Sequence, residues 1–126
     1  MIPFEFEVSP EVCKVVRSIL ARVADKWSMT TIVALRAGPR RFNELRRSTG
    51  ATQKMLTRTL RDLEREGYVI RTVKIGPVLN VSYGLTEDGR DLLPQIHNLF
   101  HWALANIGRV ERSRADFDAS VKDSIG

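Results

Sequence analysis

A row of basic side chains lies on the segment from residue 51 to residue 71, ATQKMLTRTLRDLEREGYVIR, which also has the pattern of a helix. Leu56, Leu60 and Leu63 recur at a spacing that gathers them on one narrow apolar face. At about 100° per residue, the opposite face gathers polar and basic side chains: Lys54, Thr57, Arg58 and Arg61. Such side chains bind phosphate groups and donate to base edges, so this face has the chemistry of a nucleic-acid contact.

Positive charge is concentrated around this segment. Residues 36–61 contain eight basic residues and one acid, Glu44, a local charge of +7; because the whole chain carries +5, the remainder carries −2. A basic region in an otherwise near-neutral chain indicates binding to a phosphate backbone. Two alternatives stay open: a solvated surface, and pairing of individual arginines with Asp62, Glu64 or Glu66 on the same helix.

Length and composition limit the number of domains, the compartment and the kinds of site that the chain can have. A chain of 126 residues with 43% hydrophobic residues fits one compact domain. No apolar run approaches the roughly 18 residues that span a bilayer, and the start MIPFEFEVSPE lacks the pattern of a signal peptide. We therefore expect a cytoplasmic protein without membrane contact. A single cysteine, Cys13, excludes an intramolecular disulfide and a cysteine-rich zinc site, and no cofactor is expected.

Two helices are predicted before the basic region. The first begins after Pro10 with Ser9 as its N-cap, and the second covers residues 27–37 and ends at Gly38. Six residues of the first helix are expected to point inward: Val12, Val15, Val16, Ile19, Leu20 and Val23. The core candidates of the second helix are Trp27, Ile32 and Leu35.

Two more helices follow a short extended stretch, PRRF. The third, at about residues 43–48, buries Phe42 and Leu45, and the fourth, capped by Thr52, covers residues 52–66. The segments YVIRTVKI and LNVSYGLT then alternate like two strands of a hairpin.

A long helix from Glu87 to about Ile107 completes the predicted domain of residues 1–107, and residues 108–126 are expected to form a partly disordered tail. This order of elements predicts a mainly α fold with a small β-hairpin wing: a winged helix-turn-helix with additional N- and C-terminal dimerisation helices.

In that fold, the helix of residues 52–66 enters a DNA major groove. Gln53 is suited to adenine, and Arg58 or Arg61 to guanine. Phosphate contacts are expected from Arg40, Arg41, Arg46, Arg47 and the wing residues Arg71 and Lys74. Thr52, Lys54 and Thr57 complete the predicted DNA-binding set.

Several stretches together resemble the HxlR-type winged-helix transcriptional regulators, relatives of the MarR group. They are Cys13 in the first helix, DKWSMTTIVAL at 25–35, GPRRFNELRR at 38–47, TQKMLTRTLRDLEREGYVIRT at 52–72, VSYGLTEDGRDLLP at 81–94 and LFHW ending at 102. The chain departs from the family at Cys13-Lys14, where CP is usual, and in a wing with fewer prolines. The resemblance implies a homodimer on palindromic promoter DNA, with the terminal helices forming the dimer interface: Val16, Ile19, Leu99, Phe100, Trp102, Ala103, Leu104 and Ile107.

The last helix also points to dimerisation independently. Without a partner, Phe100, Leu104 and Ile107 would form an exposed apolar patch that is uncommon on soluble monomers. A two-fold partner would cover the patch and would require an inverted-repeat operator. The alternative is that this band packs only within its own chain.

Cys13 has two interpretations. It is either a small buried hydrophobe or, as in some members of the resembled family, a sensor of oxidants or electrophiles. Lys14, Arg17 and the first turn of a helix would favour the thiolate, and a disulfide would need a second subunit or an external thiol. A small-molecule ligand could supply the signal instead.

His97 and His101 stand four residues apart on one helix face, a spacing that can bind metal. Two ligands alone make an incomplete site, so we expect an interface or surface role and no metal.

The chain offers no glycine-rich phosphate loop and no nucleophile paired with a base, so it is not expected to be an enzyme. The alternative function is a winged-helix protein-interaction module without sequence-specific DNA binding.

Overall fold

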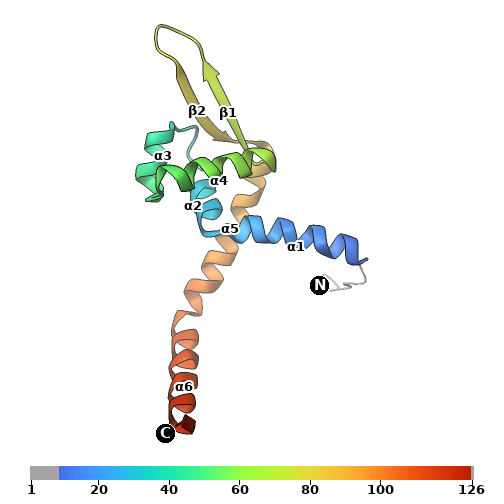
Figure 1. The fold of residues 1–126 in the computed structure, drawn as a ribbon, viewed down its shortest axis with the longest axis vertical. Helices are drawn as coiled ribbons and strands as arrows, with labels where there is room; N and C mark the ends of the chain where they lie inside the picture. The colour runs from blue at the N-terminus through green and yellow to red at the C-terminus, as the bar shows by residue number, and fades with distance from the viewer. Residues whose placement is uncertain (1–8, 126) are drawn as a thin grey trace. The chain divides into compact units, whose positions relative to one another are not determined.

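The computed structural model describes residues 9–125 (Figure 1). Its elements are α1 (Pro10–Ala24), α2 (Lys26–Ala34), α3 (Phe42–Thr49), α4 (Gln53–Arg65), β1 (Val69–Lys74), β2 (Asn80–Leu85), α5 (Glu87–Ala105) and α6 (Ile107–Ile125). This mainly helical order with one antiparallel hairpin confirms the predicted winged helix-turn-helix. The chain divides into two compact units, Met1–Asp91 and Leu92–Gly126.

Capping residues set the starts of α1, α2 and α4 and the end of α3. Ser9 caps α1 as predicted, and the Asp25 carboxylate caps α2 by accepting from the Ser28 backbone N–H at 3.0 Å. Gly50 ends α3 with a φ of 74°, a left-handed conformation that favours glycine. Thr52 then caps α4 by accepting from the Met55 backbone N–H at 3.1 Å. The turn between α3 and α4 is therefore short and fixed at both ends.

The core of the first unit lies where α2, α3 and α4 pack together. Ile32, Leu35, Leu45, Leu56 and Leu63 are fully buried there. The leucine stripe of α4 thus faces the core as predicted, while Trp27 and Phe42 are only half-buried. Because the core holds this one face of α4, its opposite face is left to solvent.

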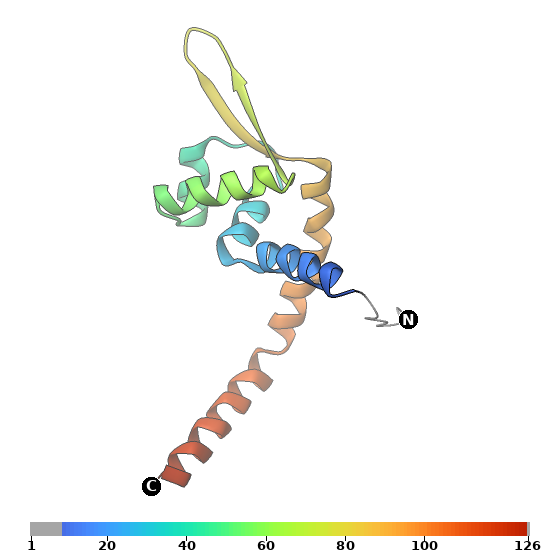
Figure 2. The ribbon, with the colours of Figure 1, turned by 45° about the vertical axis from the view of Figure 1, so that its right-hand side comes forward.

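The hairpin extends from the helices as a wing (Figures 1 and 2). Its strands pair antiparallel with Val69 opposite Leu85 and Lys74 opposite Asn80. The extended stretch before α3 joins the hairpin at Arg40, which exchanges backbone hydrogen bonds with Tyr83 at 2.9 and 2.8 Å. This bridge ties the base of the wing to the start of the helix-turn-helix.

The apolar face of α1 differs from the expectation. We expected all six of its valine, isoleucine and leucine side chains to point inward, and the family resemblance also placed Val16 and Ile19 in a dimer interface. Within the described chain, α1 has no buried residue. The exposed side chains are Val12, Val15, Val16, Ile19 and Leu20, whereas Val23 is half-buried. Periodicity therefore identified an apolar face correctly, but not its burial within the described chain.

In the second unit, the helical pattern continues beyond the predicted end of the domain. Residues 108–126 were expected to form a partly disordered tail, yet α6 runs to Ile125 after a break at Asn106. Within residues 108–125, Gly108 is the only glycine and there is no proline. The segment has few apolar residues for core contacts, but its residues still favour a helix. None of the described helices combines the length and apolar character needed to cross a membrane.

Candidate DNA-binding surface

The outer face of α4 presents the side chains that the sequence predicted. Gln53, Lys54, Thr57, Arg58 and Arg61 are all exposed. Thr57 additionally donates its hydroxyl to the Gln53 carbonyl at 2.7 Å, so part of its hydrogen-bonding capacity is used within the helix. The face is polar and basic over both the first turn and the middle of α4.

One of the three acids that could have neutralised this face, Asp62, is engaged elsewhere. Asp62 accepts from Arg22 of α1 at 3.0 Å, in an ion pair whose side chains are 31% and 27% exposed. Within the described part of the chain, Arg58 and Arg61 make no ion pair. The alternative in which these arginines serve only to pair with acids of their own helix therefore loses its support, and the contact also joins α1 directly to α4.

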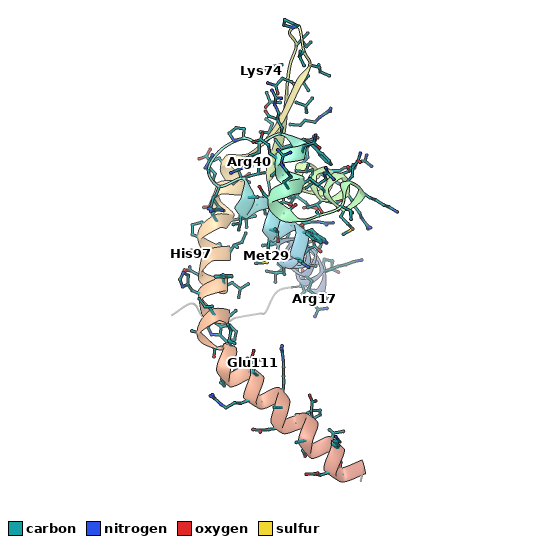
Figure 3. The ribbon with its side chains drawn as sticks, turned by 90° about the vertical axis from the view of Figure 1, so that its left-hand side faces the viewer. Arg17, Met29, Arg40, Lys74, His97 and Glu111 are labelled. Carbon is teal, nitrogen blue, oxygen red and sulfur yellow. The ribbon has the colours of Figure 1, made fainter. Side chains whose placement is uncertain are left out.

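The basic residues around α3 are divided between two environments. Arg41, Arg46 and Arg47 are exposed, whereas Arg40 is half-buried at the backbone bridge to Tyr83. Figure 3 shows Arg40 near the base of the hairpin and Lys74 well out along it. The wing residues Arg71 and Lys74 are both exposed.

A hollow of about 550 Å³ lies between the start of α3 and β2. Arg41, Asn43 and Arg47 line it from one side and Asn80 from the other, and the Asn80 Oδ1 atom is buried without a hydrogen-bond partner. Asn43 and Asn80 were absent from the predicted site, since they are separated in sequence and carry no charge pattern. Two of the predicted phosphate-binding arginines, Arg41 and Arg47, therefore line the same hollow.

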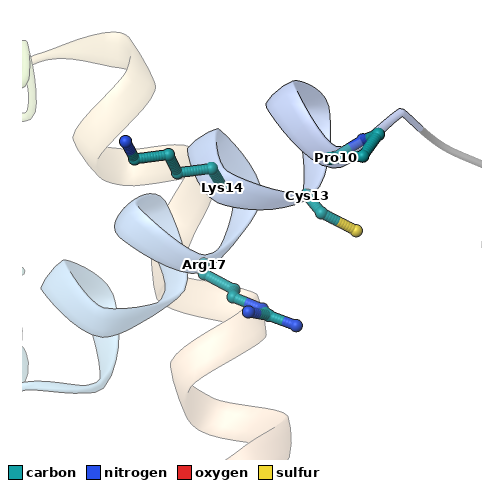
Figure 4. A pocket seen from close by; sticks show the side chains of 4 residues that line it. All are labelled: Pro10, Cys13, Lys14 and Arg17. Carbon is teal, nitrogen blue, oxygen red and sulfur yellow. The ribbon is translucent and has the colours of Figure 1, made fainter.

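Cys13 lies in the first turn of α1 as a half-buried free thiol. With Pro10, Lys14 and Arg17 it lines an open hollow of about 480 Å³. Figure 4 shows the thiol and the Arg17 guanidinium on the same side of the helix, with Lys14 pointing away. The thiol is therefore neither deeply buried nor isolated from positive charge.

The fold and this surface define a class of protein. A helix-turn-helix with an exposed basic second helix and a basic wing is a winged-helix DNA-binding module of the kind found in transcriptional regulators.

Comparisons with known proteins identify the family. The model of the HxlR-like helix-turn-helix family matches residues 22–111, so the chain belongs to that family. The HTH-type transcriptional regulator YdeP of Bacillus subtilis is 37% identical over 108 residues, which cover 85% of this chain and 84% of YdeP. The chain is thus related to DNA-binding transcriptional regulators and not to enzymes.

Solved structures agree with this assignment. The redox regulator HypR in its reduced form is 36% identical, with a TM-score of 0.70 over 78% of this chain and 98% of HypR. The reduced transcriptional regulator YodB from B. subtilis is 30% identical, with a TM-score of 0.66 over 76% of this chain and 91% of YodB.

Proposed function

We propose that the chain is a dimeric transcription factor of the cytoplasm that reads an inverted-repeat operator in double-stranded DNA through α4. The observation that carries this proposal is the exposed face of α4, whose basic side chains are held outward by a buried leucine stripe and whose arginines are free of ion pairs within the described chain. A protein-interaction module would present apolar anchors on this face, where lysine, threonine and arginine stand instead.

Arg58 and Arg61 are proposed to read bases, and Arg46 to bind phosphate. Replacing Arg58 or Arg61 by alanine is expected to weaken operator binding by about 1–3 kcal/mol and to relax specificity at one base pair. Arg46→Ala should weaken binding to every duplex alike and reduce the slope of log affinity against log salt by about one. Fluorescence anisotropy on operator variants at several salt concentrations measures both effects. Unchanged affinities for all three variants would contradict this docking mode.

Dimerisation is proposed from apolar side chains that a single chain leaves uncovered. On α5, Leu99, Phe100, Trp102 and Leu104 are 53–61% exposed, and Ile107 at the start of α6 is 47% exposed. Ala103 is exposed as well, and on α1 Val16 and Ile19 are each 42% exposed. A second copy of the chain would remove these side chains from water, a burial that favours association by roughly 25 cal/mol per Å² of apolar area before the entropic costs of binding. It would also present two copies of α4 to successive major grooves.

We propose that oxidation or electrophile modification of Cys13 is the signal that changes the affinity of the protein for its operator. The half-buried thiol beside Arg17, and the description of the structural relative HypR as a redox regulator, support this choice over a purely structural cysteine. A small-molecule effector is the alternative. The ion pair between Arg22 and Asp62 offers a route from α1 to α4, since a shift of α1 would act on the helix that carries the base-reading arginines.

Cys13→Ser is expected to retain DNA binding and to lose the response to diamide. In the wild type, diamide would accept two electrons and two protons from a pair of thiols, either Cys13 of two subunits or Cys13 and an external thiol, and a disulfide would form. Operator affinity measured before and after diamide checks this expectation. An identical response of wild type and Cys13→Ser would exclude Cys13 as the sensor.

A further inference from the structure

Two histidine rings converge on one side of α5. His97 and His101 lie one helical turn apart, and their Nε2 atoms are separated by 3.1 Å. The ring centroids are 4.3 Å apart and the ring planes are inclined at 57°. Both side chains are exposed, and Figure 3 shows where His97 lies on the helix. The two Nε2 atoms are thus close together on side chains that are accessible from solvent.

The separation of the two nitrogens matches chelation of one metal ion. Zinc lies about 2.0–2.1 Å from each ligating imidazole nitrogen. At that bond length, two cis nitrogens are about 2.9 Å apart for a right angle at the metal and about 3.3 Å apart for a tetrahedral angle. The observed 3.1 Å lies between these values. Without metal, the same distance fits one ring donating an N–H to the other.

We propose that His97 and His101 form a chelating site for a divalent transition-metal ion, one ion per chain. Imidazole nitrogen suits zinc, nickel and copper, whereas magnesium and calcium prefer oxygen ligands. Among the described residues, no group of three or more His, Cys, Asp or Glu side chains is placed to hold a metal ion, so water completes the coordination. The site is therefore open and its metal exchangeable, unlike a closed structural zinc site.

The neighbouring residues are compatible with this arrangement. The Phe100 and His101 rings are nearly perpendicular, with centroids 6.4 Å apart, and the Nε2 atom of His101 lies 3.1 Å from that of His97. Because both ligands come from one turn of α5, only the helical backbone brings them together. An ion bound there consequently stabilises that turn of the helix.

Calorimetric titration with Ni²⁺ tests the proposal, in a Cys13→Ser background that removes the only thiol. We expect one Ni²⁺ to bind per chain. His97→Gln and His101→Gln should each lower the affinity at least tenfold, because losing even an outer-shell partner typically costs about 10–100-fold. Circular dichroism confirms that each variant is folded, as expected for exposed positions.

A matched control separates chelation from the mere presence of two histidines. The double substitution His101→Gln with Gln95→His keeps two imidazoles on α5 but places them two residues apart, where side chains on a helix do not face each other. Its Ni²⁺ affinity should be as low as that of the single variants. Equal affinities for the parent protein and the control, or no Ni²⁺ binding by the parent protein, would overturn the proposal.

Discussion

Replacing Gly89 by alanine is expected to destabilise the protein by about 3 kcal/mol, although alanine is the better helix former. Gly89 is buried in the first turn of α5, where an added Cβ would lie 2.2 Å from the Tyr68 carbonyl oxygen and 3.2 Å from Leu85 Cδ2. The first of these distances falls far inside van der Waals contact. A backbone carbonyl cannot move aside as the end of a flexible side chain can.

The close approach is held in place by hydrogen bonds around Thr86. The Thr86 backbone N–H donates to Tyr68 at 3.1 Å, and its hydroxyl donates to the Gly67 carbonyl at 2.6 Å. The Gly89 backbone N–H in turn donates to that hydroxyl at 3.0 Å. Relieving the clash would therefore break the joint between the hairpin and α5.

Gly108→Ala is the matched control, and it is expected to have the opposite effect on stability. Its added Cβ would meet only the end of the Arg112 side chain at 3.5 Å, so the usual helix preference for alanine should stabilise the protein by about 0.5–1 kcal/mol. Urea unfolding at one protein concentration measures both variants, since association would make stability depend on concentration. A Gly89→Ala protein as stable as the wild type would contradict the close packing of Gly89 against the Tyr68 carbonyl.

Leu56→Ala is expected to cost about 2–5 kcal/mol of unfolding free energy. Leu56 is fully buried in the N-terminal half of α4, where it anchors the turn that carries Gln53 and Lys54 against the core. Truncation removes apolar contact and leaves a cavity, and both effects destabilise the folded state. DNA binding should accordingly be lost at a lower temperature than in the wild type.

The adjacent Met55 is the control for Leu56. Its side chain is 36% exposed, and its backbone hydrogen bonds do not depend on the side chain. Met55→Ala should therefore change the unfolding free energy by less than about 1 kcal/mol. If urea unfolding gave equal losses of unfolding free energy for the two variants, burial of Leu56 would not be what stabilises α4 against the core.

Local patterns in the sequence were sufficient to predict the helix-turn-helix. Apolar spacing placed Leu56, Leu60 and Leu63 in the core, and Gly50 and Thr52 marked the turn before α4. The family resemblance was confirmed by the match to residues 22–111. These features depend on residues close in sequence, so periodicity and capping rules are enough to find them.

Features that depend on distant residues were not predicted. The pairing of Arg22 with Asp62, and the hollow that joins Asn80 to Arg41, bring together segments about 40 residues apart, and nothing in the local pattern indicates either. The expectation that the apolar face of α1 points inward was wrong for a related reason: spacing along one helix does not specify which surface packs against that face. One local feature was also only partly predicted: the spacing of His97 and His101 indicated that they are close, but not the 3.1 Å separation of their Nε2 atoms.

Selection of bound duplexes from a random-sequence library by the reduced protein, at one stated salt concentration, tests whether α4 reads a specific DNA sequence. Reading of DNA by two copies of α4 predicts enrichment of an inverted repeat whose half-sites are about one helical turn apart, or a multiple of that distance, centre to centre. The enriched sequence should be bound at least about 10³-fold more tightly than a scrambled duplex of equal length. A library that emerges without any enriched sequence would contradict site-specific DNA recognition by α4 and would favour the protein-interaction alternative.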